Sequence, residues 1–255
     1  MARGAALAVE DLQALTELTR PLTLAKERVL PVRSDLAALL PFGGLRRGTV
    51  VQAESPSLVL ALIASATAEG SWAAFVGTPS LGLAAAVGHG VAIERIVAVT
   101  VPPPELAATV VAALIDALDV VVVGPSVVTR AADARRLAAR ARERGGVLLS
   151  LGRWPEATDL RVRVERHRWD GLDRGHGHLR GWTAEVVIEG RGAAARSQRG
   201  SIELGRSVAE GIDAFTDGLC ADGLCADGLC ADGLRADGLR SAVHPVPVVH
   251  LEQAG

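Results

Sequence analysis

The first strand–turn–helix pattern is where phosphate chemistry would lie, because a phosphate loop follows a strand and opens a helix. Such a loop needs glycines, whose backbone N–H groups surround the phosphates, and a lysine that reaches the terminal phosphates. Here the turn reads Glu54, Ser55, Pro56 and Ser57, without glycine or lysine. Proline removes an N–H donor, and Glu54 adds negative charge where a phosphate would lie. We therefore predict a degenerate phosphate loop.

Lysine is nearly absent from the whole chain. Its 255 residues include 27 lysines and arginines, and Lys26 is the one lysine. A mechanism that requires a lysine ammonium must use Lys26, which lies well before the first strand of the pattern. Codon bias of a GC-rich bacterial genome explains part of the arginine preference. Basic contacts must therefore be made almost entirely by arginine.

Residues 160–200 form the most arginine-rich part of the chain, with nine arginines, five acidic residues and three histidines. Arginine forks bind phosphate oxygens, and tryptophan rings stack on unpaired bases. We therefore predict a contact with DNA here. The candidates are Arg174, Arg180, Arg191, Arg196, Arg199, Trp169 and Trp182, and the arginines are expected in glycine-rich loops. The alternative is ordinary solvated strands in an arginine-biased protein, with the tryptophans in the core.

Other residue types that could do chemistry lack partners at a suitable spacing. The three cysteines lie five residues apart in a pentapeptide repeat within Asp217–Arg240, which is not a zinc spacing. His176 and His178 lack a third ligand in the sequence pattern. Ser126 and Ser150 lack the Gly-x-Ser-x-Gly elbow of a hydrolase. We expect no metal, no cofactor and no enzymatic activity.

Strand-like and helix-like runs alternate from Thr49 to Ser150, which predicts a parallel sheet covered by helices on both faces. The expected strands are Thr49–Ala53, Trp72–Val76, Ile93–Val99, Val120–Val123 and Gly146–Ser150. The expected helices are Leu58–Ala68, Leu81–Gly88, Pro104–Leu118 and Ala131–Arg144, with Thr129 as the cap of the last. The predicted fold class is α/β.

Helical patterns end after Arg153, and the sequence then predicts an antiparallel extension of the sheet. Its strands are expected at Leu160–Val164, Thr183–Glu189 and Ser201–Leu204, with a loop at Trp169–Gly181. The domain boundaries that follow are an N-terminal helix at 1–29, a core at 30–206, and a low-complexity tail at 207–255 that we expect to be disordered. The apolar end of this tail, Val243–Leu251, is expected either to add to a partner's sheet edge or to stay free.

Composition limits the remaining classes. The net charge of −2 excludes a general attraction to nucleic acid, so any such affinity must be local. The N-terminus lacks the apolar region of a signal peptide, and charged residues interrupt the most apolar windows. We expect a cytoplasmic, nucleoid-associated protein that does not enter a membrane. Self-association through the leucines of the N-terminal helix stays open.

Three segments resemble a known family. The first is Leu40-Pro-Phe-Gly-Gly-Leu-Arg-Arg-Gly-Thr-Val-Val51, which resembles the entry into the first strand of a RecA-like core. The second comprises Trp72–Gly77 and Gly88–Arg95, and the third comprises Trp169–Arg180 and Gly190–Arg199. Together they resemble the ImuA-type proteins of the RecA/SulA-related group, in the short form of high-GC bacteria, over roughly residues 30–204.

The resemblance implies positions for two acidic residues that a RecA-like ATPase uses. The strand after the first helix would end in the acid that activates water, and this chain has Pro79 near that position. A later strand would end in an aspartate linked to magnesium, and this chain has Gly124 there, while Asp119 lies at the wrong end. The loss of the lysine and both acids argues against ATP hydrolysis.

The family resemblance also implies a function. ImuA-type proteins act in the SOS response to DNA damage as accessory proteins of mutagenesis and translesion synthesis. The implied partners are an ImuB-like, catalytically inactive Y-family polymerase homologue and an error-prone DnaE-type polymerase. Single-stranded DNA is a further expected partner, from the arginine-rich region. Two alternatives stay open: a SulA-like inhibitor of cell division, and an unusual ATPase that binds nucleotide without the loop lysine.

Overall fold

The computed structural model describes residues 28–206, except 80, 128–129 and 174–175, together with residues 248 and 249. The strands are β1 (Val29–Pro31), β2 (Gly44–Arg46), β3 (Val50–Ala53), β4 (Ala73–Val76), β5 (Ile96–Val99), β6 (Val120–Val123), β7 (Val147–Leu151), β8 (Leu160–Asp173), β9 (His176–Gly190), β10 (Gln198–Arg206) and β11 (Val248–Val249). The helices are α2 (Ser34–Ala37), α3 (Pro56–Ala68), α4 (Leu83–Gly88), α5 (Pro104–Ala117) and α6 (Ala131–Arg144), with short 3-10 turns η2 (Ile93–Arg95) and η3 (Gly192–Ala194).

One sheet organises these elements, in the order β10-β9-β8-β3-β7-β6-β4-β5-β11. The strands from β8 to β11 along this order are parallel, whereas β8, β9 and β10 pair antiparallel. The predicted α/β class is therefore confirmed, including the mainly parallel sheet and the antiparallel strands that follow it. The two short strands β1 and β2 form a separate antiparallel ribbon.

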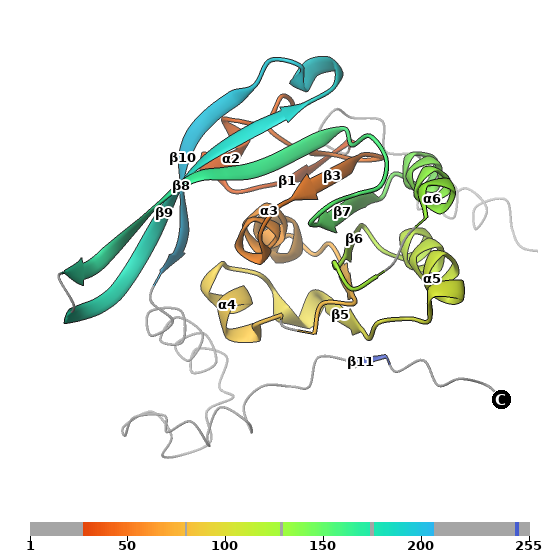
Figure 1. The fold of residues 1–255 in the computed structure, drawn as a ribbon, viewed down its shortest axis with the longest axis horizontal. Helices are drawn as coiled ribbons and strands as arrows, with labels where there is room; N and C mark the ends of the chain where they lie inside the picture. The colour runs from red at the N-terminus through yellow and green to blue at the C-terminus, as the bar shows by residue number, and fades with distance from the viewer. Residues whose placement is uncertain (1–27, 80, 128–129, 174–175, 207–247, 250–255) are drawn as a thin grey trace, which may run out of the picture.

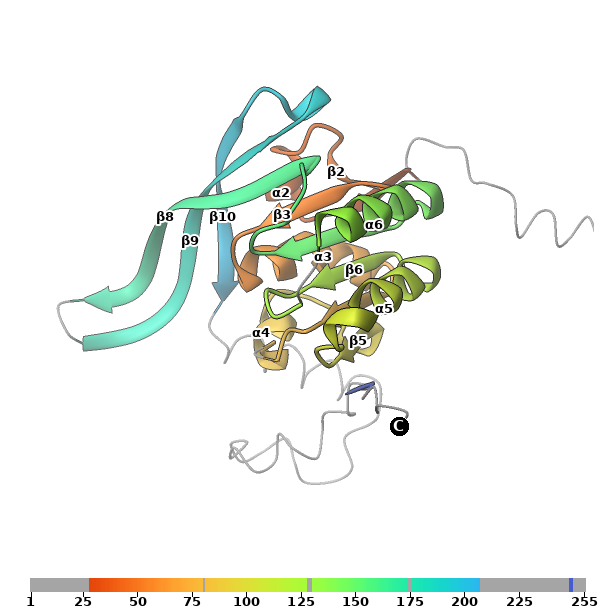
Figure 2. The same ribbon diagram turned by 45° about the vertical axis from the view of Figure 1, so that its right-hand side comes forward.

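Helices cover both faces of the parallel part, as Figures 1 and 2 show. Alternate residues of each strand contribute to two cores, because successive side chains point to opposite faces. Val51, Phe75 and Leu149 pack with α3 on one face, whereas Val121 and Leu148 pack with α5 and α6 on the other. Strands buried on both faces read as continuous apolar runs, which explains why the sequence predicted them well.

Helix α3 is buried nearly all round, from Leu58 to Ala64 and again at Ala66 and Thr67. A helix with apolar residues on every side needs cover on every side. The sheet supplies one side, and β1, α4 and β10 contact α3 as well. The antiparallel strands therefore do more than extend the sheet, because β10 helps to cover its most apolar helix.

The loop predicted at Trp169–Gly181 is wrong, since these residues belong to a long hairpin of β8 and β9. Trp169 pairs with Trp182, and Asp170 pairs with Gly181. The register shifts between Asp170 and Leu172, where Gly171 has a φ of 88°. A glycine with positive φ is typical of a β-bulge, so it bends the strand without ending it. Figures 1 and 2 show the far end of this hairpin projecting from the body.

Both predicted terminal segments lie mostly outside the described residues. Residues 1–27 of the predicted N-terminal helix and the repeats of the tail are outside the described part of the chain. Val29, the last residue of the predicted helical segment, begins strand β1 instead. Thr129 also lies outside the described residues, and the residue at the N-cap of α6 is Arg130. From the apolar end of the tail, Val248 and Val249 pair parallel with Ala98 and Val99. This short segment thus adds to the edge of the chain's own sheet.

Candidate functional site

The turn after β3 is short and its hydrogen bonds are already used. Glu54 and Ser55 alone separate β3 from α3, and Ser55 is the N-cap of the helix. The Ser55 hydroxyl accepts a hydrogen bond from the backbone N–H of Leu58 at 3.3 Å. Pro56 occupies the first helical position and supplies no N–H. Two of the donors that a phosphate would need are therefore missing or taken.

The position of the expected magnesium-linked acid is closed by backbone. Gly124 follows β6, and a Cβ placed on it would lie 2.1 Å from the carbonyl oxygen of Gly77, which follows β4. Gly77 itself has a φ of 65°, and a Cβ there would lie 2.4 Å from Val127 Cγ2. The two neighbouring strands thus approach so closely that Gly124 has no room for an acidic side chain. Pro79 lies exposed just beyond, with no carboxylate of its own.

Asp119 lies at the start of β6, as the sequence predicted, and its carboxylate holds neighbouring segments together. Its Oδ1 lies 2.8 Å from Arg47 Nη2, and its Oδ2 accepts a hydrogen bond from the backbone N–H of Trp72 at 3.2 Å. These contacts connect the amino ends of β3, β6 and β4. We therefore regard Asp119 as a structural residue at the amino-terminal edge of the parallel strands, opposite the turn after β3.

The two candidate tryptophans meet on the projecting hairpin. The rings of Trp169 and Trp182 stack with centroids 5.0 Å apart and an interplanar angle of 21°. His167 lies beside them, 5.1 Å from the Trp182 ring. Trp169 is 49% exposed, whereas Trp182 is half-buried and packs against the larger of the two hydrophobic cores. The alternative that both tryptophans lie in the core is therefore wrong for Trp169.

The candidate arginines do not form one continuous strip. Arg191 precedes η3 and Arg196 follows it, and both are exposed. Arg199 lies on β10 rather than in a loop, with Nη2 3.4 Å from Glu165 Oε1. The predicted loop position is wrong for Arg180 too, because its backbone belongs to β9. Arg174 lies outside the described residues.

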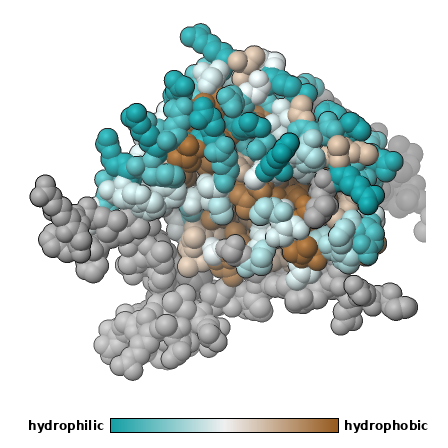
Figure 3. All heavy atoms as spheres, in the orientation of Figure 1, coloured by the Kyte–Doolittle hydropathy of each residue, from teal (hydrophilic) through white to brown (hydrophobic). Residues whose placement is uncertain are grey.

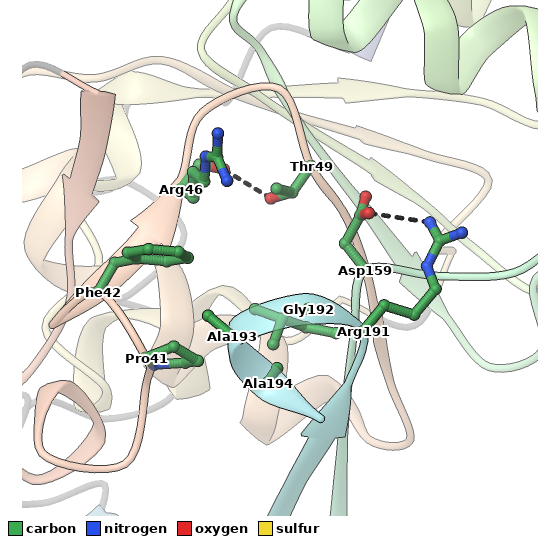
Figure 4. Close-up of a pocket in the computed structure, with 10 residues that line it drawn as sticks. Pro41, Phe42, Arg46, Thr49, Asp159, Arg191, Gly192, Ala193 and Ala194 are labelled. Atoms are coloured by element: carbon green, nitrogen blue, oxygen red, sulfur yellow. Dashed lines mark hydrogen bonds and ion pairs between the residues drawn. The ribbon is translucent and has the colours of Figure 1, made fainter. Parts of the chain in front are cut away.

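Acidic residues form ion pairs with several arginines of this region, including the candidate Arg191. Arg191 Nη2 lies 2.9 Å from Asp159 Oδ1 (Figure 4), and Arg166 Nε lies 3.9 Å from Glu185 Oε2. Exposed ion pairs of this kind are weak, so a phosphate can compete with the carboxylate. Arg191 lies beside the start of β8 and Trp169 nine residues further on, about 30 Å at 3.3 Å per residue. The structure therefore separates Arg191 from the aromatic pair.

Hydrophilic residues cover much of the surface around β8–β10, and a hydrophobic area lies near the centre of the same view (Figure 3). Within the described part of the chain, no helix has the length and apolar character needed to cross a membrane. Among the same residues, no three His, Cys, Asp or Glu side chains come together as a metal site. The side chains of His176 and His178 lie outside this description.

The fold and these positions define an α/β protein on a mainly parallel, helix-covered sheet, in which the turn between β3 and α3 is short and already hydrogen-bonded. Residues 38–156 match a family model described as the MT3502 N-terminal domain. The chain is also 41% identical over 160 residues to "Uncharacterized protein Rv3395c" of Mycobacterium tuberculosis (strain ATCC 25618 / H37Rv), which covers 59% of this chain and 76% of that protein. The chain therefore belongs to the family of Rv3395c, and its residues 38–156 match the MT3502 N-terminal domain.

Sequence reasoning found the tryptophans and the absent acids, but it missed two features. The stacking of Trp169 on Trp182 depends on cross-strand register, which the spacing of thirteen residues does not reveal. The close approach of Gly124 to Gly77 depends on the pairing of β4 with β6, which are separated along the chain by the helices α4 and α5 and by the strand β5. A glycine at the end of an apolar strand was the available signal for the second feature.

Proposed function

We propose that this protein is a non-catalytic accessory protein of damage-induced mutagenesis, of the ImuA type. It would act in translesion synthesis by binding, and its sheet would position contacts rather than a nucleotide. The observation that carries the proposal is the turn at Ser55 and Pro56 together with the closed position at Gly124. These features remove the phosphate cradle and the magnesium position from a fold of the kind that elsewhere holds ATP.

The proposed partners follow from the family resemblance. They are an ImuB-like Y-family polymerase homologue and an error-prone DnaE-type polymerase, which together copy past lesions. An adaptor for such enzymes acts where the template is single-stranded. The stacked pair of Trp169 and Trp182 supports a contact with unpaired bases, because exposed aromatic rings stack on bases of any sequence. Arg196 and Arg199 support a second, phosphate-binding group.

The test is the frequency of mutation after ultraviolet damage in the organism that encodes the protein. Deletion of the gene should abolish most of the induced mutations, and the wild-type gene should restore them. A Ser57→Ala gene should restore them equally, because no nucleotide is bound at the turn. A gene carrying Trp169→Ala and Trp182→Ala should restore fewer. An unchanged mutation frequency in the deletion strain would refute the proposal, and a block of cell division on overproduction would favour the SulA-like alternative.

A further inference from the structure

A pocket of about 350 Å³ lies at the edge of the sheet opposite the phosphate-loop turn. Thr49 and Asp159 line it, and they directly precede the parallel strands β3 and β8. The turn of Glu54 and Ser55 follows the other end of β3. The pocket is therefore separate from the position at which this kind of fold binds nucleotide.

Three distant segments of the chain build the pocket, as Figure 4 shows. Pro41 and Phe42 come from the turn before β2, Leu160 begins β8, and Ala193 and Ala194 belong to η3. Their side chains make the lining largely apolar. Phe42 is 48% exposed at the rim, so a partner that covers its ring would remove apolar surface from water.

One wall of the pocket is held firmly by Asp159. Its Oδ2 accepts a hydrogen bond from the backbone N–H of Val50 at 2.9 Å, and its Oδ1 lies 2.9 Å from Arg191 Nη2. Its carbonyl oxygen accepts a hydrogen bond from the Arg191 N–H at 3.1 Å. A Cβ on Gly190 would lie 2.1 Å from the same oxygen, so only glycine permits this approach. The charges of Asp159 and Arg191 therefore offset each other.

Arg46 is the other charged residue that lines the pocket. Its guanidinium lies over the Phe42 ring, 5.3 Å from the centroid, and so stays at the rim of the pocket. Within the described part of the chain, Arg46 makes no ion pair. One available cation beside an apolar floor does not suit a polyphosphate, which needs several donors. It suits a single carboxylate that is attached to an apolar group.

We propose that this pocket binds a segment of a partner protein in which an apolar side chain lies next to an aspartate or glutamate. The apolar side chain fills the space between Phe42, Leu160 and Ala193, and the carboxylate pairs with Arg46. Aromatic residues and arginine are enriched in the centres of protein interfaces, as Phe42 and Arg46 are combined here. This inference goes beyond the proposed function, because it requires neither DNA nor a polymerase.

A second aromatic–arginine pair provides a matched control. Arg95 lies 5.2 Å from the centroid of the Trp72 ring, and Trp72 is 37% exposed. Trp72 precedes β4, which is separated from β3 by β6 and β7. The pair therefore has the same chemistry and a similar exposure, but it does not line the pocket.

The experiment selects binders of the full-length protein from a phage-displayed library of random peptides, and titrates the selected peptides in solution. We expect selected sequences that share an acidic residue beside an apolar one. Arg46→Glu and Phe42→Ala should weaken their binding at least tenfold, which corresponds to about 1.4 kcal/mol. Ala193→Trp should do the same by filling the pocket. Arg95→Glu and Trp72→Ala should leave the affinity unchanged.

Three outcomes would overturn the inference. The first is a set of peptides that bind the Arg46→Glu variant as tightly as the wild type. The second is a basic consensus, which Arg46 would repel. The third is a selection from which no binder depends on Arg46 or Phe42. Circular dichroism of each variant distinguishes a lost contact from a lost fold, and the exposed positions of Phe42 and Arg46 make unfolding an unexpected result.

Discussion

Trp169 is the more exposed member of the stacked tryptophan pair, and its exposed surface is available to a base. Base stacking on an aromatic ring contributes about 1–3 kcal/mol. Trp169→Ala should therefore weaken binding of a labelled oligothymidine about tenfold or more, measured by fluorescence anisotropy. Trp72→Ala is the matched control. Trp72 is also exposed, but it precedes β4, which β3, β7 and β6 separate from β8 in the sheet. Equal affinities of the Trp169→Ala and Trp72→Ala variants for the oligonucleotide would show that the hairpin does not contact DNA.

Gly124 is the residue at which the absence of an acid has a steric cause. Gly124→Ala should lower the free energy of unfolding by about 3 kcal/mol, since the new Cβ would meet the carbonyl oxygen of Gly77. The measurement is urea denaturation followed by circular dichroism. Gly88→Ala, at the end of α4, is the control, because a Cβ there meets no atom within 4 Å. Similar stabilities of both variants would show that Gly124 has room for a side chain.

His89 is the C-cap residue of helix α4, and its side chain is buried. Burial, reinforced by the positive charge of Arg33, lowers the pKa of His89 from 6.5 to about 4. The folded protein thus holds His89 neutral, whereas the unfolded chain takes up a proton below about pH 6.5. Its contribution to stability is complete above pH 6.5 and is lost as the pH falls toward 4.

The resulting prediction concerns the free energy of unfolding between pH 7 and pH 4.5. We expect this single histidine to account for a decrease of about 2 kcal/mol over that interval, at 1.36 kcal/mol per pKa unit. Among the residues that the structure describes, the buried Nδ1 atom of His89 has no hydrogen-bond partner. The fold should therefore tolerate His89→Leu, and this variant should show a flatter pH dependence. His167→Leu, at an exposed position, is the control. An identical slope for the wild type and His89→Leu would contradict the prediction.

The elements that were predictable from sequence are those whose burial follows a local, regular pattern. The strand Val120–Val123 and the helix Ala131–Arg144 have the predicted bounds, because a short apolar run and an amphipathic 3.6-residue period are local signals. The hairpin of β8 and β9 was only partly predictable. Its glycines indicated a loop, but Gly171 forms a bulge and Gly181 lies inside a strand. Cross-strand pairing decided that outcome, and pairing is not local.

The pocket beside β3 was not predictable for the same reason. Phe42, Asp159 and Arg191 are far apart in the sequence, and the register of β8 with β3 and β9 brings them together. Arg191 was a DNA candidate because of its glycine-rich surroundings. In the structure its 2.9 Å ion pair with Asp159 gives it a structural role. Arg196, and Arg199 with its longer 3.4 Å contact to Glu165, are therefore the stronger phosphate-binding candidates.

At the scale of the molecule, the two edges of the parallel strands differ. The carboxyl edge has the short turn of Ser55 and the closed position at Gly124. The amino edge has exposed aromatic rings beneath arginines and a pocket with a rigid wall. The projecting hairpin adds a third surface, with stacked rings. A sheet of this kind presents contacts in several directions, which is what an adaptor requires.

The most direct test of this account is calorimetric titration of the full-length protein with magnesium and ATP. The same preparation should bind a single-stranded oligonucleotide, which confirms that it is active. We predict no saturable binding of ATP, because Ser55 and Pro56 leave no phosphate cradle and Gly124 leaves no room for the magnesium-linked acid. Tight, magnesium-dependent binding of ATP would contradict the account and would return the protein to the class of nucleotide-dependent enzymes.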